Sequence, residues 1–300
     1  MVDYEPRDND KWRGYRFITG GNATLLYFGK IMSNSHSGCP RRLLLRNYGI
    51  EPPIDEKSQA VFQNGFDWEA HVLVSLKDKG YKVEEDVKKK VALSDKTNWT
   101  VSADFIVNDE IVVETKSVNS DKRAKEVFIH GKFKTEHMLQ LAQYMFIFGK
   151  SSGVLLYGHM GSDYTYKYRS VKKEIKKFDS KQFLLNRQEN GKYVWKDPDN
   201  GEEGLFVAND ENIARTLEYL KWVLEENVHD CLEPIGWSEY VNPCSYCQFN
   251  KVCEKLPKNL DEFVGECKKV VEELIQEIEA SKQPEEFEQP SSNCEDDVPF

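Results

Sequence analysis

The chain has 300 residues, of which 39% are hydrophobic and 12% aromatic, a composition that excludes a wholly disordered protein. No apolar run is long enough to cross a bilayer, and the N-terminal sequence lacks the hydrophobic segment of a signal peptide, so we expect a cytoplasmic protein. The net charge of −10 comes from residues 261–300, which hold 13 acidic and 3 basic residues, whereas residues 1–260 hold 38 of each.

Hydrophobic periodicity predicts helices and strands in a mixed order along the chain. The predicted helices are residues 57–79, 135–148, 211–226 and 261–282, and the first two end at Gly80 and Gly149. The predicted strands are residues 81–87, 99–107, 111–118, 153–157 and 164–171, with the last two pairing. We therefore expect an α/β fold with a central mixed β-sheet flanked by helices.

The composition divides the chain into three predicted parts. Residues 1–260 are predicted to form one domain, residues 261–283 a charged helix, and residues 284–300 a disordered acidic tail. Within the first part, residues 116–134 and 167–187 are basic and interleaved with aromatic side chains. That composition suits a groove that contacts phosphates and stacks bases, with Lys122 and Arg123 as candidate DNA contacts, but it also suits a solvated helix face.

The strands 99–107 and 111–118 carry three polar residues whose spacing can be tested. Glu114 and Lys116 share one face of their strand, because alternate residues point the same way. A two-residue turn would send Asp104 to the opposite face from Glu114, whereas a three-residue turn at 108–110 would set them opposite each other. A shared site therefore requires an odd-length turn or a bulge.

Two carboxylates and a lysine in this arrangement are typical of a hydrolytic site for phosphodiesters. Asp104 and Glu114 would bind Mg²⁺ or Mn²⁺, which lowers the pKa of bound water, and Lys116 would stabilise charge on the phosphate. The alternative is that charged residues end two edge strands by chance.

Two helices offer further candidates for the same site. Gln140 and Tyr144 lie at positions i and i+4, so both can reach the phosphate or the attacking water. His71 is a candidate third metal ligand, although a lone histidine on a half-apolar helix is more often a hydrogen-bonded core residue.

Four cysteines form a split ligand set. Cys244, Cys247 and Cys253 are clustered, and Cys39 lies far upstream. In a reducing compartment such thiolates bind metal, either as a [4Fe–4S] cluster or as structural Zn²⁺. Either group would tie the N-terminal arm to the C-terminal segment and stabilise the domain.

The order of these motifs resembles the PD-(D/E)XK nucleases of the RecB nuclease-domain type. The matching positions are Gly65 with His71, Asp104, Glu114-Thr115-Lys116 and Gln140-x3-Tyr144. The cysteines narrow the resemblance, over residues 18–260, to the iron–sulfur branch, which includes CRISPR-associated RecB-like exonucleases and the AddB nuclease domain. Two departures are Ala103 in place of the proline, and a gap from Gly65 to His71 longer than the family's usual three intervening residues.

The resemblance implies a restriction-endonuclease-like core and a [4Fe–4S] cluster rather than zinc. It also implies a metal-dependent deoxyribonuclease, most simply an exonuclease on single-stranded ends in recombination, repair or CRISPR spacer acquisition, encoded by a bacterium or its phage. Arg41 and Arg42, beside Cys39, are candidate contacts to DNA phosphates. The alternative function is a non-catalytic iron–sulfur DNA-binding adaptor, against which the intact catalytic motif argues.

The last residues are similar to the acidic tip of bacterial single-stranded-DNA-binding proteins. In such a tip a terminal phenylalanine enters an apolar pocket and the acidic residues contact a basic rim. The tail could therefore recruit a host protein or occupy the chain's own DNA groove, and the alternative is a solubility tail. The residues concerned are Asp296, Asp297, Pro299 and Phe300.

Overall fold

The computed structural model describes residues 15–20, 23–28, 56–92, 98–168 and 171–225, together with Lys269, Glu273 and Gln276, which are helical. All seven cysteines, Arg41, Arg42 and the acidic tail lie outside the described residues, as does the predicted domain boundary at residue 260.

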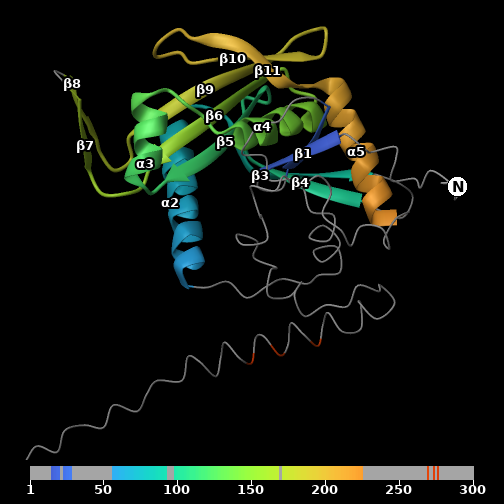
Figure 1. Ribbon diagram of the computed structural model, residues 1–300, viewed down its shortest axis with the longest axis horizontal. Helices are drawn as coiled ribbons and strands as arrows, with labels where there is room; N and C mark the ends of the chain where they lie inside the picture. The colour runs from blue at the N-terminus through green and yellow to red at the C-terminus, as the bar shows by residue number, and fades with distance from the viewer. Residues whose placement is uncertain are drawn as a thin grey trace, which may run out of the picture.

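The core of the described chain is a seven-stranded mixed sheet in the order β11-β10-β9-β6-β5-β4-β3 (Figure 1). Of its pairings only β5 with β6 is parallel, and the others are antiparallel. The predicted mixed sheet is therefore confirmed. Its strands are β3 (Val83–Ala92), β4 (Asn98–Val107), β5 (Ile111–Val118), β6 (Ser152–His159), β9 (Ser180–Arg187), β10 (Lys192–Lys196) and β11 (Glu203–Asn209).

Three long helices accompany the sheet, and sequence periodicity located each of them to within about one residue. They are α2 (Glu56–Asp78), α4 (Thr135–Phe148) and α5 (Asp210–Glu225). α4 ends where predicted because Gly149 adopts the left-handed conformation, with φ of 70°, and closes the last turn. Within the described residues, no helix has the length and apolarity needed to cross a membrane.

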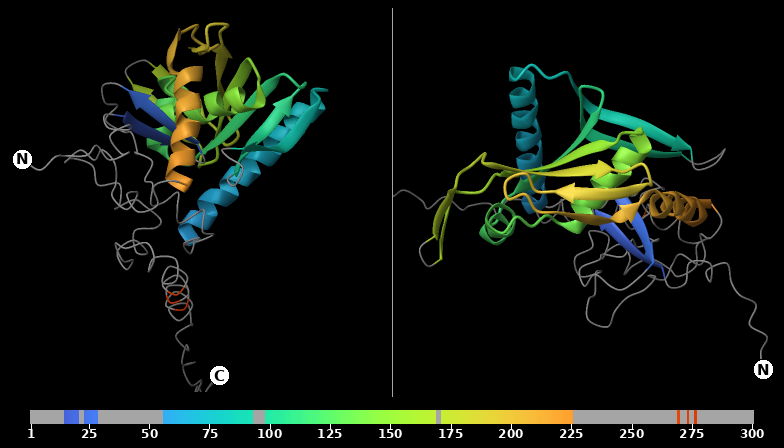
Figure 2. Two further views of the ribbon diagram at one scale, coloured as in Figure 1. Left: turned by 90° about the vertical axis from the view of Figure 1, so that its right-hand side faces the viewer. Right: turned by 90° about the horizontal axis from the view of Figure 1, so that it is seen from above.

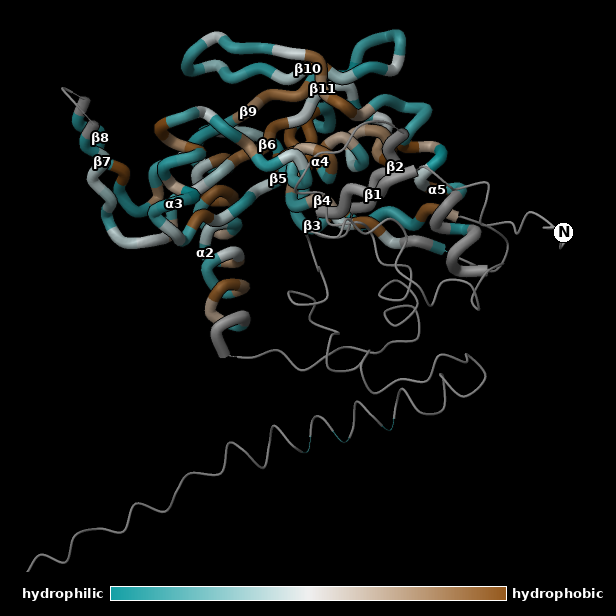
Figure 3. The backbone as a smooth tube through the Cα atoms, in the orientation of Figure 1, coloured by the Kyte–Doolittle hydropathy of each residue, from teal (hydrophilic) through white to brown (hydrophobic). Residues whose placement is uncertain are grey.

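The two faces of the sheet pack against different helices. Along β5, Val112 and Val118 belong to the hydrophobic core that contains α4, whereas Val113 packs with Trp68 and Val72 of α2. Hydrophobic residues gather in the inner strands and α4, and the outer hairpin turns are hydrophilic (Figure 3). A central strand thus carries an apolar side chain to each helix layer in alternation.

The hairpin between β4 and β5 has the predicted three-residue turn. Val107 pairs with Ile111, and the ladder continues to Phe105 opposite Val113. Continuing this register by one residue sets Asp104 opposite Glu114. Within the turn Asn108 and Asp109 have φ of 52° and 60°, a conformation that these two residue types tolerate better than most.

Two small sheets stand beside the main one. β1 (Tyr15–Gly20) pairs with β2 (Ala23–Phe28), and this ribbon packs on α4 and α5 (Figure 2). β7 (Tyr164–Tyr168) pairs with β8 (Val171–Ile175) and projects from the body.

The sequence-based pairing of 153–157 with 164–171 is wrong, because β6 pairs instead with β9 and β7 with the next strand. The helical alternative for 167–187 is also wrong, because β8 and β9 occupy most of this segment. The charged residues of β8 and of the turn that follows it are exposed, whereas Lys181 of β9 points to the interior and is only 7% exposed. The first predicted strand is displaced, since β3 begins at Val83 and continues to Ala92.

Candidate active site

The β4–β5 ladder stops at the point where the acidic residues lie. Beyond Phe105 and Val113 no backbone pairing joins the two strands, although β4 stays paired with β3 and β5 with β6. The Asp104 carboxylate occupies this divergence: its Oδ2 accepts the Thr115 N–H at 2.7 Å and the Thr115 hydroxyl at 2.9 Å. The Asp104 side chain thus accepts the Thr115 N–H in place of a backbone carbonyl of β4. These bonds hold Asp104 against β5 and leave its Oδ1 without a bond to Thr115.

Glu114 is fully buried beside Lys116. The Lys116 ammonium donates to Oε1 of Glu114, while Oε2 is buried without a hydrogen-bond partner. Burial, followed by repulsion from Asp104, raises the pKa of Glu114 to about 8, although Lys116 opposes this shift. Burial acts to lower the pKa of Lys116, but the charges of Glu114 and Asp104 outweigh it and raise that pKa.

Glu69 of α2 is a third carboxylate at this site, and sequence analysis did not select it. Burial raises the pKa of Glu69 to about 7, and repulsion from Asp104 adds to the rise, while Lys116 lowers it. The signal for it was present, because Gly65 and Glu69 are separated by the three residues usual in the family motif. Sequence analysis passed over this spacing and placed the helix-borne ligand at His71 instead.

α4 brings Gln140 and Tyr144 to the carboxylates, as their spacing predicted. Gln140 Nε2 donates to the Tyr144 hydroxyl at 3.0 Å, and Gln140 Oε1 is buried without a partner. Burial and then the charge of Glu114 raise the pKa of Tyr144, so this phenol is protonated at neutral pH. α4 therefore presents a neutral hydroxyl and an unpaired amide oxygen.

A basic cluster adjoins Lys116 around the buried Tyr157. Tyr157 Oη accepts the Lys134 N–H at 3.0 Å and an N–H of Arg123 at 3.4 Å, and it contacts His137 Nδ1 at 2.9 Å. Burial, with the charges of Lys116, Lys134 and Arg123, lowers the pKa of His137 well below its usual value. His137 is therefore neutral at pH 7, so Tyr157 can donate its proton to Nδ1 and leave the histidine proton on Nε2.

The two predicted DNA contacts of the described chain lie in α3 (Asp121–Ala124), directly after β5. Lys122 is exposed, whereas Arg123 is partly buried and pairs with Glu126 at 2.8 Å. Arg123 also lies over the Tyr157 ring, 5.6 Å from its centroid. Arg123 thus faces the basic cluster, and Lys122 faces solvent. The helix continues as η2 (Lys125–Ile129), a single π-helical turn.

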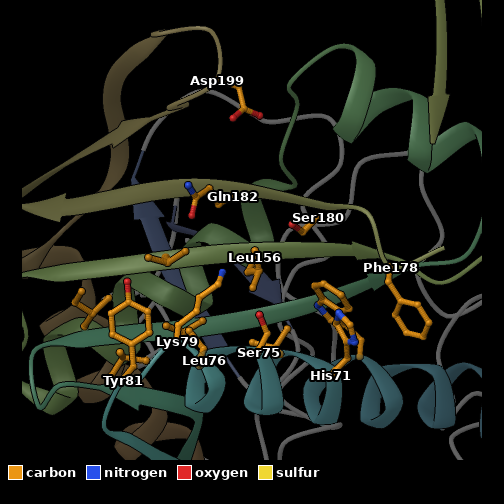
Figure 4. Close-up of a pocket in the computed structure, with 16 residues that line it drawn as sticks. His71, Ser75, Leu76, Lys79, Tyr81, Leu156, Phe178, Ser180, Gln182 and Asp199 are labelled. Carbon is orange, nitrogen blue, oxygen red and sulfur yellow. The ribbon is translucent and has the colours of Figure 1, made fainter. Parts of the chain in front are cut away.

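His71 lies elsewhere. Its ring stacks on Phe178, with centroids 4.6 Å apart, and on Trp68 at 5.5 Å, and it lines a pocket beside α2 (Figure 4). Positions 69 and 71 are about 200° apart around a helix, so one side of α2 carries Glu69 and the other His71. His71 therefore lies on the opposite side of α2 from Glu69, and we propose Glu69 rather than His71 as the metal ligand carried by this helix.

The donor set fits a hard divalent cation. Glu114 Oε2 has no partner, and Asp104 keeps one oxygen outside its bonds to Thr115. Burial, and then repulsion from Asp104, raise the pKa values of Glu114 and Glu69, a cost that a bound cation would remove. In the described part of the chain, no three histidine, cysteine or acidic side chains already converge closely enough to hold an ion. Asp104 and Glu114 are thus the primary candidates, with Glu69 beside them.

Comparison with known protein families finds one likeness. Residues 67–162 match the model of the PD-(D/E)XK nuclease superfamily, a segment that contains Glu69, both strand carboxylates, Lys116 and the α4 residues. The match covers about a third of the chain and includes every residue of the candidate site. No curated protein matches the chain.

Solved structures show weaker likenesses. The chain is 19% identical to SSO0001, covering 72% of this chain and 81% of that one, with a TM-score of 0.37. It is 20% identical to an alkaline exonuclease of Laribacter hongkongensis; the match covers 49% of this chain and 73% of that one, and its TM-score is 0.33. The chain is 17% identical to the same exonuclease in complex with dAMP; the match covers 63% of this chain and 77% of that one, and its TM-score is 0.36. No activity is inferred for this chain from similarities as distant as these.

Proposed function

We propose that the chain is a metal-dependent deoxyribonuclease that degrades single-stranded DNA ends as an exonuclease, in recombination, repair or CRISPR spacer acquisition. The observation that carries the proposal is the fully buried Glu114, whose free oxygen lies beside Asp104 and Lys116 where β4 and β5 separate. A buried carboxylate with a raised pKa is costly to keep, and such groups concentrate at functional sites. The nuclease-superfamily match over residues 67–162 supports the same reaction.

Asp104 and Glu114 would hold Mg²⁺ or Mn²⁺, with Glu69 as a further ligand. When bound, the cation supplies a Lewis acid and lowers the pKa of water. The remaining chemistry belongs to side chains of this chain. Lys116 lies between the carboxylates and the basic cluster, so its ammonium can neutralise charge that develops on the phosphate.

α4 and the basic cluster position the substrate. Gln140 Oε1, which lacks a partner, can accept a hydrogen bond from the attacking water and orient it, and the protonated Tyr144 can donate a hydrogen bond to a phosphate oxygen. Arg123, oriented by Tyr157 and Glu126, supplies a fixed positive charge next to Lys116. The site is thus divided into a half that binds a cation and a half that binds a phosphate.

The experiment is a cleavage assay with 5′- and 3′-labelled single-stranded DNA in Mg²⁺ or Mn²⁺. Asp104→Asn should abolish cleavage, and Asp109→Asn is the matched control, since Asp109 is an exposed carboxylate on the same hairpin. Asparagine tolerates the left-handed backbone at position 109, so the control keeps the turn. Equal activity of wild type, Asp104→Asn and Lys116→Ala would refute the enzyme and favour a DNA-binding module.

The iron–sulfur part of the proposal rests on Cys39, Cys244, Cys247 and Cys253, which lie outside the described residues. Their spacing suits four thiolate ligands of either zinc or a [4Fe–4S] cluster, and the order of the motifs, which resembles the iron–sulfur branch, is what favours the cluster. Anaerobically purified protein should absorb in a broad visible band, as thiolate-bound iron clusters do. If the protein is colourless and contains one equivalent of zinc, the four cysteines form a structural zinc site and the cluster is ruled out.

A further inference from the structure

A cavity of about 490 Å³ opens between α2 and the β5-β6-β9 face of the sheet (Figure 4). It lies on the His71 side of α2, away from the acidic site. Its floor is apolar, and Ser75, Ser180 and Gln182 supply polar groups around it. Apolar walls with a few polar groups are the usual composition of a small-ligand site.

Three aromatic rings form a continuous stack at one end of this cavity. His71 lies between Trp68 and Phe178 with interplanar angles of 23° and 22°. Trp68 packs against Gly158, where a Cβ atom would come within 2.2 Å of the indole. The buried Trp68 Nε1–H has no hydrogen-bond partner, although it belongs to a residue that lines the cavity. The stack is therefore anchored on the sheet and retains an unused donor.

Phe178 holds its ring in place with a strained backbone. Its φ is +70°, in the left-handed region that bulky side chains avoid, yet its side chain is 40% exposed. Hydrogen bonds impose this conformation: Phe178 N–H donates to His159 O at 2.7 Å and Lys176 N–H to the Asp179 carboxylate at 2.8 Å. Glycine would adopt the turn without strain. A strained, exposed aromatic residue beside a cavity indicates a contact with a ligand.

The charges around the stack favour a nucleotide over a neutral ligand. Lys176 and Lys177 are exposed next to Phe178, and the Lys177 ammonium lies 5.2 Å from the Phe178 ring centroid. Lys79 lines the cavity. Asp199, an acidic residue of the lining, is paired with Lys181 at 2.6 Å, an ammonium that it shares with the buried Asp197. Aromatic faces flanked by lysines are what single-stranded nucleic acid binds, by stacking of the base and attraction of the phosphate.

The cavity and Lys116 lie on opposite faces of the sheet. Lys116 is paired with Tyr157 of β6, which belongs to the core on the α4 side, whereas Leu156 of β6 lines the cavity on the α2 side. The Phe178 backbone is bonded to His159, the last residue of β6, so the stack lies at the end of this strand, where single-stranded DNA can pass from one face to the other around the end of the sheet.

We propose that this cavity binds an unpaired nucleobase of the DNA substrate, stacked on the Phe178–His71–Trp68 rings. The inference rests on the proposed nuclease function and names a substrate contact outside the acidic site. It makes single-stranded DNA the bound form, because a base in a duplex is not free to enter.

The test uses the full chain carrying Lys116→Ala, so that DNA is bound without being cut. Binding of a fluorescein-labelled single-stranded oligonucleotide is measured by anisotropy, with an abasic site placed at each position in turn. At one position the abasic site should weaken binding about 10-fold, the size of one lost aromatic–base stack. Adding Phe178→Gly should weaken binding of intact DNA by the same factor and remove the abasic effect at that position.

Glycine is chosen because it relieves the backbone strain, so the change removes the ring without disturbing the turn. Phe66→Ala is the matched control, since Phe66 is an aromatic residue of α2 that is 61% exposed and does not line the cavity. Phe178→Trp should keep the abasic effect.

The inference and the nuclease proposal can fail separately. Unchanged affinity and an unchanged abasic profile in Phe178→Gly would overturn the stacking site even if wild-type protein cleaves DNA. If Phe178→Gly lowers the affinity for intact DNA and removes the effect of the abasic site, but the wild-type protein cleaves no DNA, the base-binding site is established and the nuclease proposal is rejected.

Discussion

Replacing Glu114 with glutamine should make the protein more stable and at the same time inactive. In the folded protein the pKa of Glu114 is about 8, against a usual value of 4.5. The unfolded chain therefore ionises first as pH rises. Stability that is fully present below pH 4.5 is lost progressively up to about pH 8. With 1.36 kcal/mol per pKa unit, the full loss is on the order of 5 kcal/mol.

Glu114→Gln removes this loss because glutamine does not ionise. In protein stripped of divalent cations, urea denaturation should show a stability advantage of the variant that grows by about 3 kcal/mol between pH 5.5 and pH 8.5. Adding Mn²⁺ at a hundred times its Kd should restore about 2.7 kcal/mol to wild type at pH 8.5 and much less to the variant. If the difference in stability between wild type and Glu114→Gln does not change with pH, the claim that the buried Glu114 ionises at a cost to stability is refuted.

Three further outcomes are expected. Gly158→Ala would place a Cβ atom 2.2 Å from the Trp68 ring and should lower stability by about 1–3 kcal/mol, whereas Gly65→Ala, with open space around it, should raise it by about 0.5–1 kcal/mol; urea denaturation measures both. Thr115→Val removes the hydroxyl that holds Asp104 and should slow cleavage about 10-fold at nearly constant KM, while an unchanged kcat would contradict that positioning role. Tyr157→Phe leaves the Lys134 N–H, which is only partly buried, without its acceptor and should cost about 1 kcal/mol of stability; a thermal melt like that of wild type would show that the hydrogen bonds of Tyr157 do not stabilise the fold.

Local signals in the sequence predicted the elements that form the site. Gly149 ends α4 in the left-handed conformation that glycine favours, so this helix boundary was correct. Strand parity, together with the requirement that Asp104 and Glu114 share a face, predicted an odd-length turn or a bulge, and the pairing of Val107 with Ile111 confirms an odd-length turn of three residues. Both signals depend on neighbouring residues, which a sequence displays directly.

The failures concern contacts between distant segments. Nothing near 153–157 indicates that β9 rather than β7 pairs with it, because strand pairing depends on the whole sheet. Glu69 acquires its role only when α2 lies against the end of β4 and β5 and desolvates its carboxyl. His71 was selected by residue type, but its orientation around α2 sends it to the aromatic stack instead. Burial and orientation are properties of the fold, and residue type does not reveal them.

The turn at 108–110 has a consequence for how this hairpin can vary. An exposed turn is ordinarily where a chain accepts insertions and deletions without harm. Here the number of residues between Val107 and Ile111 decides which face of the sheet Asp104 occupies relative to Glu114. A change of one residue would leave every side chain of the site in the protein but on opposite faces of the sheet. The tip can therefore exchange its residues only for those that tolerate the left-handed backbone of positions 108 and 109, and a change in its length would disrupt the site as a change of a catalytic residue would.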